Sequence, residues 1–156
     1  MNASFRLARY RFELEALDEL CMPAYQGSTF RGGLGHALKR LVCGAPDWRG
    51  CAPCARRNDC PYGYLFATTT PPNTPGLHGL HEIPPPFVIE APAGEPRRYH
   101  PGERLGFELV LIGRAIDYLP YFLMSFQELG RAGVGRPAGR YTLRSIHACP
   151  PWRGEQ

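Results

Sequence analysis

The chain has 156 residues, a length that suits one domain with its own hydrophobic core or one complete half of a two-domain protein. Its composition, 44% hydrophobic and 21% charged, is that of an ordinary globular protein and excludes a largely disordered chain. The net charge is +4, and Lys39 is the one lysine among 18 basic residues. Arginine pairs with phosphates and stacks on bases, so this bias is compatible with RNA binding, and codon bias in a GC-rich genome would produce it equally well.

No run reaches the roughly 20 apolar residues that span a bilayer, and the N-terminus lacks the apolar core of a secretory signal. We therefore expect a cytoplasmic protein without a membrane partner. Disulfides are rare in that compartment, so the six cysteines require another explanation.

The chain opens with a predicted strand and a predicted helix. Residues 5–15 alternate apolar and charged side chains, which indicates a half-buried strand. Residues 25–40 carry apolar side chains at helical spacing, and Ser28 or Thr29 is the expected N-cap because its hydroxyl can accept from the first free N–H groups.

This helix is rich in glycine, although each glycine costs roughly 1 kcal/mol relative to alanine inside a helix. A close approach to the backbone would explain the glycines. Gly32 lies one turn before His36 and leaves the space beside the imidazole open to a packed strand or a phosphodiester backbone. His36, Lys39 and Arg40 share the polar face, so one face packs and the other is available for chemistry. Tight packing beside a solvated basic face is the alternative.

Residues 43–86 are predicted to form a long loop insertion, because proline and glycine interrupt any regular pattern. Four cysteines fall within 18 residues of it, and the central two have the Cys-x2-Cys spacing that lets two sulfurs reach one tetrahedral ion. We expect a structural zinc ion with no open coordination position. An iron–sulfur cluster and unligated thiols are the alternatives. The predicted ligands are Cys43, Cys51, Cys54 and Cys60.

The rest of the chain completes a two-helix pattern. Alternation, capping and turn signals predict strands at 87–90, 105–111 and 141–146, a helix at 118–129 and a basic glycine loop at 130–140. The order βαββαβ predicts an α+β, ferredoxin-like fold, the fold of RNA-recognition modules: a four-stranded antiparallel sheet with two helices on one face. We assign residues 1–148 to this domain and 149–156 to a tail or a linker to a second domain.

Several motifs together resemble the CRISPR-associated RAMP proteins that process precursor CRISPR RNA. They are Pro23-Ala-Tyr-Gln-Gly-Ser-Thr-Phe-Arg-Gly-Gly-Leu-Gly-His36, the Cys-x2-Cys…Cys-Pro-Tyr block ending at Tyr64-Leu-Phe66, Pro-Pro-Phe-Val-Ile-Glu, Leu111-Ile-Gly-Arg-Ala-Ile-Asp-Tyr-Leu-Pro-Tyr-Phe122, and Gly130-Arg-Ala-Gly-Val-Gly followed by an Arg140-Tyr-Thr-Leu strand. The likeness covers most of residues 10–146.

The resemblance implies a metal-independent endoribonuclease that cuts CRISPR repeat RNA, built from two ferredoxin-like domains of which this chain supplies the first. It further implies a catalytic set of His36, Lys39 and Tyr25. The chemistry fits these residue types, because RNA carries its own 2′-hydroxyl nucleophile, histidine has an ordinary pKa of about 6.5, and lysine can neutralise a phosphate. The predicted RNA-binding residues are Arg31, Arg40, Arg131, Arg136 and Arg140.

Two other functions remain open at this point. The chain could be a non-catalytic RNA-binding subunit that joins other subunits of a CRISPR effector complex, in which case His36 would be dispensable. It could also be a zinc-stabilised protein-interaction module whose arginines reflect codon bias.

Overall fold

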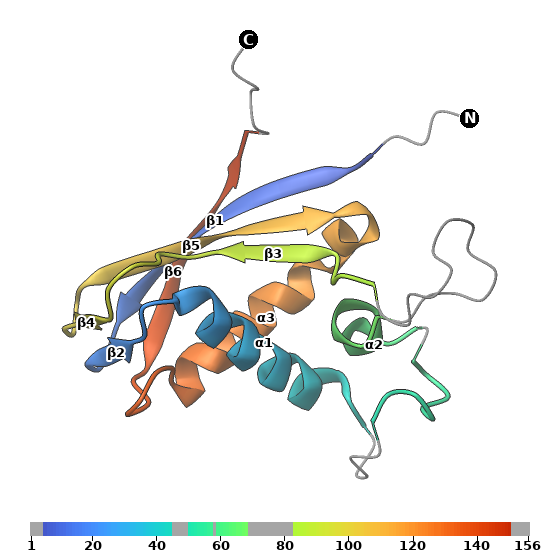
Figure 1. Cartoon of the computed structure of the whole chain (residues 1–156), viewed down its shortest axis with the longest axis horizontal. Helices are drawn as coiled ribbons and strands as arrows, with labels where there is room; N and C mark the ends of the chain where they lie inside the picture. The colour runs from blue at the N-terminus through green and yellow to red at the C-terminus, as the bar shows by residue number, and fades with distance from the viewer. Residues whose placement is uncertain (1–4, 45–49, 58, 69–82, 151–156) are drawn as a thin grey trace.

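A computed structural model describes residues 5–44, 50–57, 59–68 and 83–150. Within this part the fold is α+β, with a four-stranded antiparallel sheet covered by helices on one face (Figure 1). In spatial order the strands are β3 (Phe87–Glu90), β5 (Arg104–Ile112), β1 (Leu7–Ala16) and β6 (Tyr141–Cys149). A separate two-stranded sheet pairs β2 (Leu20–Met22) with β4 (Arg97–Tyr99).

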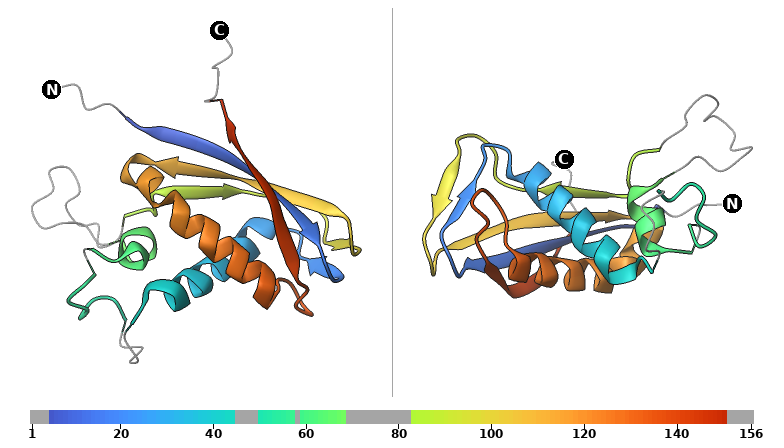
Figure 2. Two further views of the ribbon diagram at one scale, coloured as in Figure 1. Left: turned by 180° about the vertical axis from the view of Figure 1, so that it is seen from behind. Right: turned by 90° about the horizontal axis from the view of Figure 1, so that it is seen from below.

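Two long helices lie side by side across the covered face of the sheet (Figure 2). These are α1 (Gln26–Val42) and α3 (Leu119–Ala132), and α3 follows a 3-10 turn, η1 (Gly113–Tyr118). A short helix, α2 (Pro61–Phe66), packs beside the C-terminal half of α1. Among the described residues, no helix has the length and apolar character needed to cross a membrane.

Strand alternation explains which side of the sheet is buried. In β1, Phe12, Leu14 and Ala16 are buried, whereas the charged residues between them point to the opposite face and stay partly exposed. Phe107 of β5 is paired with Phe12 and lies at the centre of the core. Its ring centroid is 5.0 Å from that of Phe12, 4.8 Å from that of Phe30 and 4.7 Å from that of Phe126.

The prediction of an α+β fold with a four-stranded antiparallel sheet is confirmed. Both long helices pack on one face of it, and the strand order is compatible with a ferredoxin-like fold. The short strands β2 and β4 were not predicted, because three-residue strands carry too little alternation to register as a pattern.

Two local predictions were wrong. The helix α1 begins at Gln26 with Tyr25 as N-cap, and the Ser28 hydroxyl, already inside the helix, donates to the Tyr25 carbonyl at 3.0 Å. The predicted loop insertion contains the helix α2, which starts at Pro61 because the first helical position needs no N–H donor. Its Leu65 is fully buried, so tertiary packing stabilises a helix too short to persist alone. Residues 69–82 of the insertion lie outside the described part.

Candidate functional site

A groove of about 540 Å³ lies between α1 and α2. One wall is a single stripe of α1, because its members recur at a spacing of three to four residues and therefore stack on one helix face. The other wall is the aromatic side of α2. The lining residues are Ser28, Arg31, Gly32, Gly35, His36, Lys39, Tyr62 and Phe66.

Three glycines of α1 differ in what lies next to their Cα atoms. A Cβ on Gly33 would lie 2.6 Å from the side chain of Leu129, so this glycine lets α3 approach. A Cβ on Gly35 would lie 3.2 Å from the ring of Phe66, so that glycine lets α2 approach. A Cβ on Gly32 would meet no atom within 4 Å, which leaves open space one turn before His36. The close neighbours at Gly33 and Gly35 are therefore other helices, and the space at Gly32 belongs to the groove.

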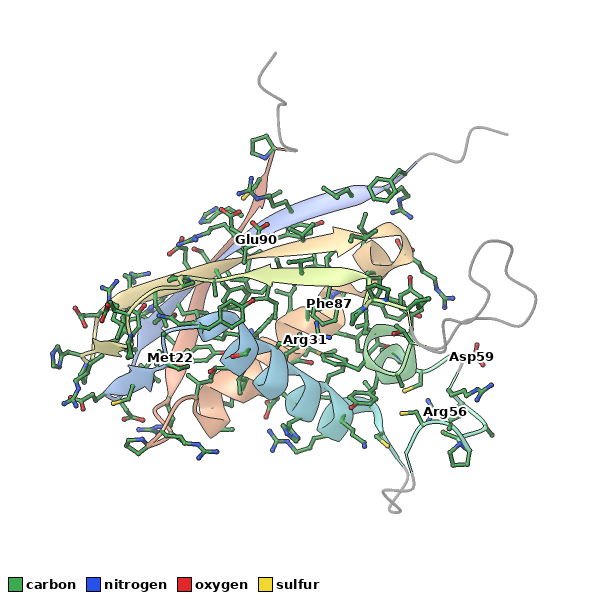
Figure 3. All side chains as sticks on the ribbon, in the orientation of Figure 1. Met22, Arg31, Arg56, Asp59, Phe87 and Glu90 are labelled. Atoms are coloured by element: carbon green, nitrogen blue, oxygen red, sulfur yellow. The ribbon has the colours of Figure 1, made fainter. Side chains whose placement is uncertain are left out.

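Aromatic rings hold the basic side chains of the groove. The Lys39 ammonium lies 5.3 Å from the ring centroid of Tyr62. The Arg31 guanidinium lies 5.2 Å from the Phe87 ring centroid and 5.9 Å from that of Phe66, and Figure 3 shows Arg31 and Phe87 close together between α1 and β3. Such cation–π contacts restrain a cation without neutralising it. Arg31 remains exposed, so its guanidinium is accessible from the groove.

Tyr62 adds a polar group to the aromatic wall. Its ring stacks on Phe66 with centroids 5.3 Å apart and an interplanar angle of 13°. Burial raises the pKa of Tyr62, and the nearby thiols of Cys51 and Cys43 raise it further. The phenol therefore stays protonated at neutral pH, where its hydroxyl can donate a hydrogen bond.

Two of the residues predicted on or near α1 lie away from this groove. Tyr25 is the N-cap of the helix and is 61% exposed. It precedes His36 by about 16 Å along the helix axis, at 1.5 Å per residue. Arg40 is exposed in the last turn of α1 but does not line the groove. The groove thus gathers His36, Lys39 and Arg31 from the predicted set, and leaves out Tyr25 and Arg40.

The predicted basic glycine loop 130–140 begins inside α3, which extends to Ala132, and residues 133–140 form a separate region next to β2. A Cβ on Gly135 would collide with the Cys21 carbonyl oxygen, so this glycine is required for packing against β2. Arg140 is held by Asp18, with Nε 2.8 Å from Oδ2 and Nη2 3.1 Å from Oδ1. Two further arginines of the predicted loop are exposed: Arg131, in the last turn of α3, pairs with Glu128, and Arg136 stands beside Gly135. The loop arginines do not join His36 in the groove.

The Asp18–Arg140 pair predicts a pH-dependent contribution to stability. The hydrogen bonds from Arg140 lower the pKa of Asp18 from 3.8 to about 2. A carboxyl group whose pKa is lower in the folded than in the unfolded protein stabilises the fold at pH values above its unfolded pKa. This stabilisation is lost as the pH falls from about 4 toward about 2. Asp18→Asn should therefore lower the urea midpoint of unfolding at pH 7. Near pH 2 the urea midpoints of this variant and the unchanged protein should be nearly equal. Asp59→Asn, at an exposed site, is the control; a constant deficit of Asp18→Asn across this pH range would contradict the assignment.

The four predicted metal ligands lie along the segment that runs from the end of α1 to the start of α2, and in the described residues they are not placed around one ion position. Cys43 is the C-cap of α1 and Cys60 is the N-cap of α2, while Cys51 and Cys54 lie in the turns between them. Burial raises the pKa of the Cys51 thiol, Lys39 opposes this rise, and the other three thiols add to it. Cys51 therefore lies near each of the other three thiols.

The sheet face opposite the helices carries ion pairs instead of aromatic rings. RNA-recognition modules stack bases on aromatic side chains of this face. Here the paired positions on the four strands that share the side of Arg9 and Arg11 hold no Phe, Tyr or Trp, and the one histidine among them is His147, opposite Arg11. The ion pairs are Arg9–Glu108, Arg11–Glu13, Arg104–Glu15 and Arg144–Glu15. These four arginines are already paired with three carboxylates, so the groove is the stronger candidate site for a phosphate backbone.

Comparison with known proteins places the chain in a family. A family model described as AF_1859_N, N-terminal domain, matches residues 5–156. The chain belongs to this family. An uncharacterised protein of Archaeoglobus fulgidus is 26% identical over 148 residues, which cover 94% of this chain and 47% of that protein. The chain spans about half the length of this relative.

Sequence reasoning missed the aromatic wall of the groove. Tyr62 and Phe66 come from a segment predicted to be loop, and Phe87 comes from a strand that was predicted without a role in the site. Tyr62 and Phe66 are four residues apart after a proline that can open a helix, and this spacing was the available signal. Their partner on α1, Gly35, could not be assigned without the tertiary contact.

Proposed function

We propose that this domain binds RNA in the groove between α1 and α2 and cleaves it by attack of a 2′-hydroxyl. The observation that carries the proposal is the convergence of His36, Lys39 and Arg31 on one open space at Gly32. Two cations beside a histidine suit a phosphodiester, and the rings of Tyr62 and Phe66 offer faces on which bases stack. A ferredoxin-like fold for the domain, as in RNA-recognition modules, is part of this proposal.

The proposed reaction uses the nucleophile that RNA itself carries. His36 takes the proton from a 2′-hydroxyl while that oxygen attacks the adjacent phosphorus. The bond from phosphorus to the 5′-oxygen breaks, and the leaving 5′-oxygen takes up a proton from water. Lys39 and Arg31 neutralise the charge that develops on the phosphate oxygens. The products are a 2′,3′-cyclic phosphate and a 5′-hydroxyl, and no step requires a metal ion.

CRISPR repeat RNA is the proposed substrate, on the basis of the resemblance to RAMP proteins that process precursor CRISPR RNA. One observation favours a second candidate, a non-catalytic RNA-binding subunit of a CRISPR effector complex. The resemblance implies a tyrosine near the catalytic histidine, whereas Tyr25 stands at the other end of α1. Tyr62 is the tyrosine that shares the groove with His36.

Cleavage of repeat RNA in EDTA tests the proposal directly. The protein at its natural length is incubated with the repeat and with an otherwise identical repeat that has one 2′-deoxynucleotide at the cut site. We expect cutting of the first RNA only, with a cyclic phosphate on the product. Cutting of the deoxy-substituted site would contradict 2′-hydroxyl attack, and binding without any cutting would favour the non-catalytic subunit.

Replacing Lys39 should change how RNA affinity depends on salt. Each phosphate contact releases counterions, so losing one contact on single-stranded RNA should reduce the slope of log affinity against log salt by about 0.7. We expect this reduction for Lys39→Gln in fluorescence anisotropy titrations. Arg136→Gln removes one positive charge outside the groove and should leave the slope nearly unchanged. Equal reductions in both variants would argue against a specific contact at Lys39.

A further inference from the structure

In the described turns between α1 and α2, the partly buried side chains are cysteines. Among the described residues of 50–60, the partly buried ones are Cys51, Cys54 and Cys60, and every other one is exposed. This segment contributes no side chain to the hydrophobic core. Figure 3 shows Arg56 and Asp59 on the outer side of the segment, away from the sheet. An apolar core therefore does not explain why these turns take one shape.

Backbone contacts nevertheless fix the turns in a specific arrangement. The Cys54 N–H donates to the Cys51 carbonyl at 3.0 Å, which closes the Cys-x2-Cys turn. The Cys60 N–H donates to the Arg56 carbonyl at 2.8 Å and leads the chain into α2. A Cβ on Gly63 would collide with the Arg57 carbonyl oxygen, so the segment packs tightly on the first turn of α2. Three thiols are thus half-buried in a segment whose other described side chains are exposed.

Two of the four thiols are fixed by helix ends. Cys43 closes α1, where its N–H donates to the Lys39 carbonyl at 2.9 Å. Cys60 opens α2, where its carbonyl accepts from the Tyr64 N–H at 3.0 Å. The contact of Gly35 with Phe66 holds these two helices together. Rigid helix ends supply two ligands and the Cys-x2-Cys turn supplies two more, which is how structural zinc sites are built.

We propose that Cys43, Cys51, Cys54 and Cys60 bind one zinc ion as four thiolates and that this ion fixes α2 against α1. Four sulfur ligands in a tetrahedron, each about 2.3 Å from the ion, leave no open position, so the ion has a structural role. In the described part of the chain, no group of three or more His, Cys, Asp or Glu side chains is already placed to bind one metal ion. The ion therefore draws the thiols together and completes the local fold as it binds, with release of the thiol protons.

Metal analysis of the purified 156-residue chain tests this site. We expect about one zinc per chain by inductively coupled plasma mass spectrometry, and nearly none in the double variant Cys51→Ser/Cys54→Ser. Cys21→Ser and Cys149→Ser are matched controls outside the cluster and should keep the metal. A metal-free folded protein, iron with labile sulfide, or equal loss of zinc in the controls would overturn the proposal.

A second measurement covers the case in which the serine variants do not fold. Titration of the metal-depleted, unchanged chain with Co²⁺ should give the visible bands of a tetrahedral ion and thiolate charge-transfer absorption in the near ultraviolet. At free zinc about 100 times its Kd, the midpoint of thermal unfolding should rise by roughly 5–10 °C. Absence of the thiolate bands would overturn the site. Neither readout depends on RNA, so the zinc proposal and the proposed function fail separately.

Discussion

His36→Ala is expected to reduce cleavage of repeat RNA by about 10²–10⁴-fold while RNA affinity stays nearly constant. General acid–base catalysis by a positioned side chain contributes an acceleration of this size. Binding should persist because Lys39, Arg31 and the aromatic wall remain in the groove. Single-turnover cleavage in EDTA gives the rate, and anisotropy with a non-cleavable RNA gives the affinity, both with the protein at its natural length.

Tyr25→Phe is the matched control for His36→Ala, since it also alters a side chain implied by the resemblance. Tyr25 lies at the far end of α1 from His36, so the change should leave the cleavage rate within about two-fold, far below the contribution of a group acting in proton transfer. Normal cutting by His36→Ala would remove the proposed catalytic role. A large loss in Tyr25→Phe would show that the reacting phosphate lies nearer the N-terminal end of α1.

Phe107→Ala is expected to lower the free energy of unfolding by about 3–5 kcal/mol, the range measured for truncating buried aromatic residues. Phe107 is fully buried and contacts the rings of Phe12, Phe30 and Phe126 from both layers of the fold. The loss is a large fraction of the roughly 5–15 kcal/mol that stabilises a typical domain. Urea unfolding followed by circular dichroism measures it.

The control for Phe107→Ala makes the same chemical change at the surface. Phe5 is 76% exposed, so Phe5→Ala should change the free energy of unfolding by less than about 0.5 kcal/mol. A loss below about 1 kcal/mol in Phe107→Ala would mean that these phenylalanines do not form the centre of the core. In that case the packing of α1 against the sheet would need another explanation.

The main sheet could be predicted because its two long central strands carry their own pattern. The paired residues Phe12 and Phe107 fall on the buried side of alternating sequences, so the buried face of each strand follows from period two. The helix α2 could not be predicted in the same way. Its six residues are stabilised by Leu65 in the core and by Phe66 against Gly35, and these are contacts between segments distant in sequence.

The same distinction between local pattern and tertiary contact applies to the residues of the candidate site. His36 and Lys39 share a helix face by local geometry alone, so the sequence was sufficient to group them. Tyr62 reaches them only because α2 packs on α1, which is a tertiary contact. Arg140 was predicted to contact RNA, but no local pattern reveals that Asp18, far away in the chain, holds its guanidinium. Residues on one helix could be grouped from the sequence, and residues joined across elements could not.

Crosslinking of RNA to the protein tests most directly whether the groove between α1 and α2 is the RNA site. Repeat RNA containing 4-thiouridine is irradiated with the protein at its natural length, and the crosslinked peptides are identified by mass spectrometry. We expect crosslinks within residues 28–39 and 61–66, with Tyr62 among the modified positions, because these residues line the groove. Crosslinks confined to the glycine loop 130–140 or to the ion-paired face of the sheet would contradict the proposed site.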